Sequence, residues 1–454
     1  MQPSPPTLEL GDIQGAVLKQ LPLRGCGGGP QPYAGSYFVL RIGDAAEGRA
    51  LLQRMLPYVA SAADWWTATE QVVISVALSF QGLKALGLPQ ASLDSFPPEF
   101  QQGMAARADK IGDVGESSPA NWEKPFGTPD VHLALVVVAR NATILEAALA
   151  NARTILQSLP RVAVLSQIDI APLPTGRTHL GYHDGIGQPL IEGSDEPSYP
   201  GQGPVIRAGE LILGYPDQLG QVRPMPQPAV LGRNGTYLAV RKLHERVAAF
   251  RQFLRRNADS PAAEELLAAR LVGRWRSGAP LMLAPTEDDP ALGADPHRNN
   301  DFRYFDDDPA GLKCPVGAHI RRANPRDGLT GQVADVNIHR ILRRGGSYGP
   351  MLPEGVLEDD GQDRGIVFLC MGTSLVRQYE FVKSQWLNDG NFVGLDTEKD
   401  AIVGANDGTG SFTIPRRPIR QRLQKVPRFV IARGGEYCFV PSLGALRWMA
   451  ALGS

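Results

Sequence analysis

The sequence predicts an α+β protein built from two similar units, in which antiparallel sheets are covered by helices. Three observations support this fold class. The chain has 454 residues, more than one hydrophobic core usually accommodates, so two domains are favoured. Strand-like and helix-like segments alternate along the first half, and the second half has the same ingredients. Apolar residues make up 43% of the chain and charged residues 20%, which is typical of a folded protein.

The first half alternates between the two element types. Apolar runs rich in β-branched residues predict strands, whereas apolar residues spaced three and four apart predict helices. The predicted strands are 36–42, 71–80, 131–140 and 161–170, and the predicted helices are 45–56, 80–86 and 143–159. A long loop over 94–130 interrupts this order.

The second half repeats the pattern with more irregular sequence between its elements. The predicted strands are 210–215, 237–243, 365–371 and 428–431, and the predicted helices are 245–257, 262–272 and 374–388. The Gly- and Pro-rich stretch 198–209 is the expected boundary, which divides the chain into domains 1–204 and 205–454. Segment 280–308 is polar and irregular, and long loops of this kind in compact chains are usually functional.

Composition excludes several classes of protein. The 46 basic residues are balanced by 47 acidic ones, so the basic excess of a nucleic-acid-binding protein is missing. The 4 cysteines lie far apart without a CxxC pair, which argues against a disulfide scaffold or a zinc cluster. The beginning of the chain lacks a signal-peptide pattern, and no apolar run is long enough for a membrane span. We therefore expect a cytoplasmic protein, although export by another route would leave no such mark.

Three polar segments remain as candidate sites, since the sequence contains no GxxxxGK[ST] or HExxH motif. Residues 181–189, GYHDGIGQP, place Asp184 between glycines, a pattern that in isolation is more typical of a tight turn. Residues 314–326, CPVGAHIRRANPR, contain His319 before several arginines, which suits a core histidine or a haem ligand with guanidinium groups near the propionates. Residues 339–349, HRILRRGGSYG, are in isolation a basic strand end.

Together and in this order, the GxxDG element and the segments AHIRRANPRD and ILRRGGSYG resemble the dye-decolorising peroxidase family of haem proteins. The resemblance extends to the opening LELGDIQGAVL, to residues 80–113 and to VFLCMGTSLVRQYEFVKSQWLN, so it covers nearly the whole chain. It implies two ferredoxin-like domains, with haem b in the C-terminal domain and the GxxDG motif in the N-terminal domain. It also implies a peroxidase that reduces hydrogen peroxide and oxidises bulky dyes or phenolic compounds by one-electron steps.

The resemblance also implies a role for individual residues. His319 matches the proximal iron ligand, Asp184 the distal carboxylate and Arg343 the distal arginine. Position in the family pattern favours Asp400 as the carboxylate that accepts the second N–H of the proximal histidine, with Asp396 as the alternative. Further haem contacts are implied for Gly185, Ile186, Gly187, Asn324, Pro325 and Arg326. Ile366 and Phe368, two apart on a strand and so on one face, are candidates to line the distal side.

This chain departs from some relatives beside the distal arginine. Where they carry Arg-Asp-Asn, it has Arg343-Arg344-Gly345, so a distal amide is missing and a larger role is expected for Arg343. His183, next to Asp184, is expected to face away from the haem.

Several alternatives remain open at this stage. Candidate electron relays at the surface are Trp386, Trp448, Tyr348 and Tyr379, although core packing is the favoured interpretation of each. A haem-binding or iron-releasing protein without a peroxidase role, and a structural protein that kept the fold without the cofactor, are the alternatives for function. The pattern is compatible with a monomer or a homodimer.

Overall fold

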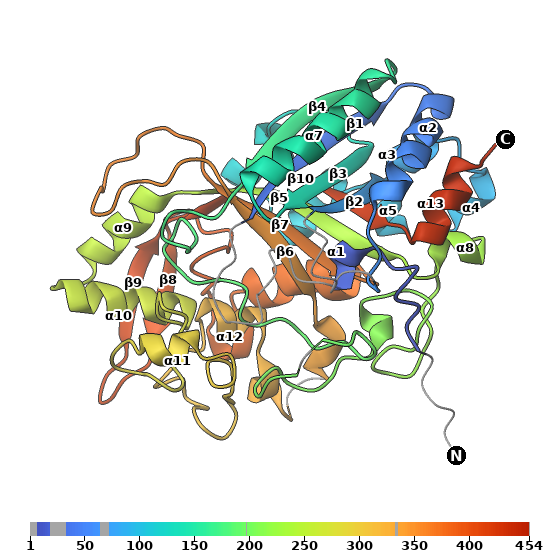
Figure 1. Ribbon diagram of the computed structural model, residues 1–454. Helices are drawn as coiled ribbons and strands as arrows, with labels where there is room; N and C mark the ends of the chain where they lie inside the picture. Colours follow the sequence, from blue (N-terminus) through green and yellow to red (C-terminus); the bar gives the residue numbers. More distant parts are fainter. Residues whose placement is uncertain (1–6, 19–32, 64–71, 197, 332–334, 454) are drawn as a thin grey trace.

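The computed structural model describes residues 7–18, 33–63, 72–196, 198–331 and 335–453. Its centre is one 8-stranded antiparallel sheet with the order β4-β1-β3-β2-β10-β5-β7-β6 (Figure 1). The first half of the chain supplies β1 (Ala34–Ile42), β2 (Val72–Ser79), β3 (Leu133–Ala139) and β4 (Val162–Ile170). The second half supplies β5 (Thr236–Glu245), β6 (Leu342–Tyr348), β7 (Gly365–Gly372) and β10 (Val430–Val440).

The two halves have the same topology. Each places its fourth strand next to its first, followed by its third and its second, which is the duplicated ferredoxin-like order that the sequence predicts. The halves do not form separate sheets, because β10 pairs with β2 through Cys438 opposite Ser79 and Phe439 opposite Leu78. The edge strands β4 and β6 also approach each other, and the N–H of Ala171 donates to Ser347 O at 3.1 Å. The predicted domain boundary at 198–209 stays a prediction.

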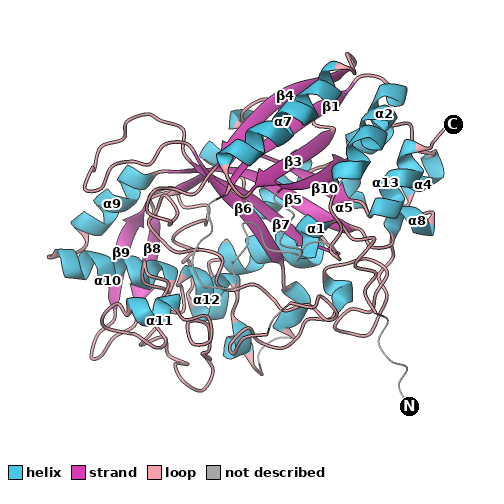
Figure 2. Ribbon diagram, viewed as in Figure 1, coloured by secondary structure: helices cyan, strands magenta, loops and turns pink. Residues whose placement is uncertain are grey.

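Apolar side chains cover both faces of the sheet. Strand β3 reads LALVVVA without alternation because Val137 packs into one apolar cluster and Val136 into another on the opposite face. Helices cover the Val137 face (Figure 2), among them α2 (Ala45–Met55), α3 (Phe80–Ala85), α7 (Ala142–Gln157) and α13 (Leu443–Ala450). Helix α7 begins where Asn141 accepts the N–H of Ile144, and it buries apolar residues spaced three and four apart.

A separate part of the second half packs beside the sheet. It contains α9 (Val247–Arg256), α10 (Pro261–Val272) and the hairpin of β8 (Gly410–Ile414) and β9 (Gln421–Val426). The short helix α12 (His319–Ala323) lies beside α10 in Figure 1. The remaining α-helices are short: α1 (Gly15–Leu18), α4 (Gln90–Asp94), α5 (Pro98–Gln102), α6 (Ala108–Ile111), α8 (Ala229–Gly232) and α11 (Pro290–Ala294).

The structure corrects several of the predicted elements. The strand at 210–215 is wrong, because a 3₁₀ turn at Ala208–Glu210 and further turns replace it, and the apolar run is buried by packing rather than by strand pairing. The loop at 94–130 contains short helices, and the helix at 374–388 consists of two π-helical segments, Val376–Glu380 and Val382–Leu387. The helix predicted from 245 begins two residues later, at Val247, because Glu245 is still the last residue of β5. In the part of the chain that the structure describes, no helix has the length and apolar character of a membrane span.

Candidate active site

His319 is the first residue of α12 and is paired with a carboxylate. Its Nδ1 lies 3.0 Å from Asp400 Oδ2, and Asp400 is fully buried whereas the imidazole is partly exposed. Because Nδ1 is engaged, Nε2 is the nitrogen left to bind a metal. The structure therefore places Asp400, and not Asp396, beside the predicted iron ligand.

Asp400 is held as an anion by its surroundings. Burial on its own raises the pKa of this carboxyl, but contacts with His319 and with the N–H of Val403 outweigh burial and lower the pKa below its usual range. Asp400 Oδ1 accepts the N–H groups of Ile402 at 2.9 Å and of Val403 at 2.7 Å. A fixed carboxylate of this kind orients the imidazole and increases its basicity.

Asp184 and Arg343 come together from segments far apart in the sequence. Arg343 lies on the edge strand β6, and its Nη1 is 3.6 Å from Asp184 Oδ1, which also accepts the N–H of Gly185 at 2.6 Å. Gly181 and Gly185 flank Asp184 with φ values of 92° and 83°, a backbone region that favours glycine. The motif glycines thus form the turn that presents the carboxylate to the arginine.

Gln188 ties this loop to β6, a role that the sequence did not indicate. Its side-chain Nε2 donates to Arg343 O at 3.0 Å, and the N–H of Arg343 donates to Gln188 Oε1 at 3.2 Å. The amide therefore makes both hydrogen bonds that a neighbouring strand would make with this edge residue. The only sequence signal was its place within GYHDGIGQP.

The strand register places further predicted residues near Arg343. Arg343 is opposite Cys370 on β7, so its side chain shares a face of the sheet with Cys370, Phe368 and Ile366. Phe368 and Ile366 are only partly buried. Gly345 is opposite Phe368 with φ 144°, and a Cβ at this position would lie 2.0 Å from Val367 O. The backbone itself therefore excludes the amide side chain that some relatives carry there.

Arginines without carboxylate partners lie around Arg343. Burial, with Arg326 and Arg343 nearby, lowers the pKa of Arg340 to about 10, and burial with the same neighbours lowers the pKa of Arg274 to about 9. Among the described residues, Arg274, Arg326 and Arg340 form no ion pair and bind carbonyl groups instead, for example Gly278 O, Phe302 O and Asn324 Oδ1. This concentration of positive charge favours an anionic ligand.

Two arginines that follow His319 are structural. Arg321 pairs with Asp308 at 3.2 Å, and Arg322 is fully buried and donates to the carbonyl groups of Trp386, Asp389 and Glu398. Of the basic cluster predicted near the propionates, only Arg326 belongs to the group around Arg343.

Comparisons with known proteins agree with this arrangement. Residues 12–167 match the family of the DyP dimeric alpha+beta barrel domain. A dye-decolorizing peroxidase of Mycena epipterygia is 32% identical over 91% of this chain and 84% of its own length. The chain belongs to the dye-decolorising peroxidase family.

Solved structures show the same similarity. A dye-decolorizing peroxidase in complex with 2,6-dimethoxyphenol has a TM-score of 0.85 at 28% identity, over 98% of this chain and 100% of that chain. A fungal DyP-type peroxidase from Auricularia auricula-judae has a TM-score of 0.82 at 29% identity, over 98% of this chain and 100% of that chain. These comparisons confirm the predicted family, fold and peroxidase activity. Dye-decolorising peroxidases are haem enzymes, so membership of the family implies a haem cofactor.

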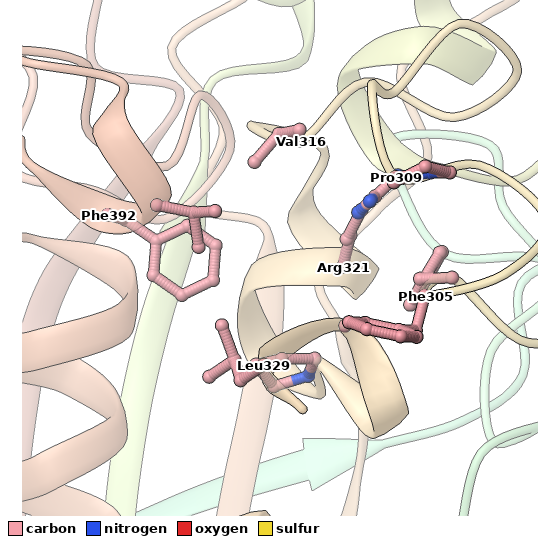
Figure 3. Close-up of a pocket in the computed structure, with 10 residues that line it drawn as sticks. Phe305, Pro309, Val316, Arg321, Leu329 and Phe392 are labelled. Carbon is pink, nitrogen blue, oxygen red and sulfur yellow. The ribbon is translucent and has the colours of Figure 1, made fainter. Parts of the chain in front are cut away.

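The other residues for which the resemblance implies haem contacts follow Asp184 or His319 closely in the sequence. Ile186 is buried, Asn324 follows α12 and accepts from Arg340, and Arg326 has φ 53°. Pro325 lines a small cavity of about 90 Å³ that also includes Phe305 and Leu329 (Figure 3). That cavity contains none of His319, Asp184 and Arg343, so it is not the site assembled above.

The candidate relay residues are mostly inside the protein. Tyr348, Tyr379 and Trp386 are buried, and Trp448 packs partly buried against the large cluster around Val137. His339 stacks on Phe381 with 3.7 Å between ring centroids, and Trp386 meets this pair edge-on. These contacts agree with the core-packing interpretation.

Proposed function

We propose that this protein binds haem b through His319, reduces hydrogen peroxide with Asp184 and Arg343, and oxidises dyes and phenolic compounds by one-electron steps. The observation that carries the proposal is the presence of two pairs, His319 with Asp400 and Asp184 with Arg343, together with arginines near Arg343 that form no ion pair among the described residues. The complex of a similar peroxidase with 2,6-dimethoxyphenol supports phenols as reductants.

The residues present fit a haem group. His319 keeps Nε2 for the iron because Asp400 holds its Nδ1. Two propionates would neutralise part of the positive charge of Arg340, Arg343 and their neighbours. The partly buried side chains of Ile366 and Phe368 offer an apolar surface to a porphyrin. Haem, when bound, supplies the redox centre that takes up the oxidising equivalents of peroxide and passes them to reductants one electron at a time.

The protein side chains would handle the proton and the charge. Asp184, which is largely exposed in a loop, would accept a proton from one oxygen of hydrogen peroxide and return it to the other, so that water leaves. Arg343 would stabilise the negative charge that develops as the oxygen–oxygen bond breaks. Gln188 would keep these two side chains in register, since it fastens the backbone of Arg343 to the Asp184 loop. Asp400 would keep His319 oriented.

The His319→Ala variant is expected to lose most of its haem or to hold it weakly, because the protein-to-iron bond is removed. His339→Ala is the matched control: it also removes a ring, but one that stacks on Phe381 and whose Nδ1 bonds to Arg377 O instead of a carboxylate. Haem content, measured by the pyridine haemochromogen assay, also identifies haem b. Equal haem content in both variants would remove His319 from its proposed role. If the native protein binds haem but does not oxidise 2,6-dimethoxyphenol with peroxide, the alternative of a haem-binding or iron-releasing protein is preferred.

A further inference from the structure

Glu245 is a buried carboxyl group that the proposed mechanism does not use. It ends β5 with 6% of its surface exposed, and its Oε2 has no hydrogen-bond partner among the described residues. Other buried glutamates are paired: Glu380 with Arg107, Glu210 with Arg377, and Glu398 with Thr413. A buried acid without such a partner is rare in proteins and needs an explanation.

Strand register places Glu245 on the face of the sheet that carries the candidate peroxide site. Leu243 of β5 is opposite Ile366 of β7, and Glu245 lies two residues further along, so its side chain is on the same face. Arg343 and Phe368 share that face. The N–H of Glu245 donates to Arg364 O at 2.9 Å, which holds its backbone next to the start of β7.

The loop that carries Asp184 covers this end of the sheet. Leu180 and Tyr182 pack in one apolar cluster with Val430, and Val430 is the β10 partner of Glu245. Burial and, as the smaller cause, the negative charge of Asp184 together raise the pKa of Glu245 to about 8. The negative charge of Asp184 therefore acts on the carboxyl group of Glu245.

The other charged groups around Glu245 are occupied elsewhere. Arg364, before β7, binds Pro350 O and Asp360, and His244 on β5 binds Asp363. Arg246, which follows on the chain, pairs with Glu116. Tyr348, at the end of β6, donates to Leu243 O and Asp363. Among the described residues, no cation is paired with Glu245, so nothing offsets its charge once it ionises.

We propose that Glu245 is a second carboxyl group of the peroxide site and that it is uncharged while the enzyme works. When Glu245 loses its proton in alkaline solution, it places a second negative charge beside Asp184, and this charge slows the reaction with peroxide. This rests on the proposed function. Arg343 stabilises negative charge developing on peroxide, and a second carboxylate opposes that stabilisation. Below its pKa of about 8, Glu245 is neutral and the rate is at its full value; above it, the rate falls. The released proton goes to the solvent. Glu245 affects the reaction only through its charge beside Asp184, so it is a positioning residue and not a catalytic residue.

The test uses Glu245→Gln, which keeps shape but cannot ionise. The matched control is Glu436→Gln, since burial also raises the pKa of Glu436, to about 7, but its carboxylate binds the N–H groups of Met104 and Tyr437 instead. Stopped-flow rates of the haem-loaded proteins with hydrogen peroxide are measured well below and well above the pKa of Glu245. We expect the rates of the native and Glu436→Gln proteins to fall about tenfold on the alkaline side, the factor that corresponds to one pKa unit of interaction. The rate of Glu245→Gln is expected to stay level.

Infrared difference spectroscopy gives a readout that does not depend on turnover. The carbonyl stretch of a protonated carboxyl should disappear as the native protein is titrated through the pKa of Glu245, and this change should be missing in Glu245→Gln. The native titration remains informative even if the variant folds poorly. An alkaline fall in rate that persists in Glu245→Gln, or a native protein without a titrating carboxyl in this range, would overturn the proposal and leave the proposed function intact. If the native protein does not react with peroxide at any pH, both are wrong.

Discussion

The Asp184→Asn variant is expected to react with hydrogen peroxide about 10² to 10⁴ times more slowly than the native protein, which corresponds to roughly 3 to 5 kcal/mol of barrier. Asparagine keeps the size of the side chain and can still accept the N–H of Gly185, but it cannot take up the peroxide proton. Haem content should therefore be unchanged, and stopped-flow absorbance at limiting peroxide measures the rate.

Asp195→Asn is a suitable control for this variant, because Asp195 is an exposed aspartate further along the chain and its φ of 56° is tolerated by asparagine. It should react at the native rate. A native rate in Asp184→Asn itself would assign the base to another group.

The Arg343→Leu variant is expected to be slowed at least as strongly, by about 10² or more, because a preorganised charge is lost. The backbone at Gly345 leaves no room for a second distal side chain that could replace the arginine. The variant should also bind haem more weakly, since Arg343 belongs to the group of arginines that favours propionates. Stopped-flow rates together with haem titration measure both effects.

Arg343→Lys separates charge from geometry in the same experiment. Lysine keeps the positive charge but loses the planar fork of the guanidinium, so part of the haem affinity should return while the rate stays low. If Arg343→Leu reacted with peroxide at the native rate, Arg343 would have no part in peroxide activation.

The apolar strands were predictable because their sequence reflects burial on both faces. Strand β3 and helix α7 match their predicted ranges closely, since continuous β-branched residues and 3.6-residue periodicity are strong local signals. Strand β6 is LRRGGSY, a sequence with little strand propensity, and it is a strand only because it pairs with β7. The apolar run at 210–215 shows the reverse, since burial without pairing gives the same local signal as a strand.

The candidate site was only partly predictable, because contacts between segments far apart in the chain leave no signal in the local sequence. His319, Asp184 and Arg343 lie in motifs with a family resemblance, and the structure brings Asp184 to Arg343 and Asp400 to His319. Gln188 could not be assigned, because its partner Arg343 is 155 residues away and the contact is to backbone. Glu245 looked like the start of a helix, and its relation to Asp184 depends on the register of β5 and β7.

An absorption spectrum of the purified, haem-loaded protein, before and after one equivalent of hydrogen peroxide, tests the central claim most directly. We expect a Soret band that shifts on addition of peroxide and returns when 2,6-dimethoxyphenol is added as a one-electron reductant. The shift should be strongly delayed in Asp184→Asn, and the band itself should be weak or missing in His319→Ala. A protein that binds no haem, or a Soret band that peroxide leaves unchanged, would contradict the account.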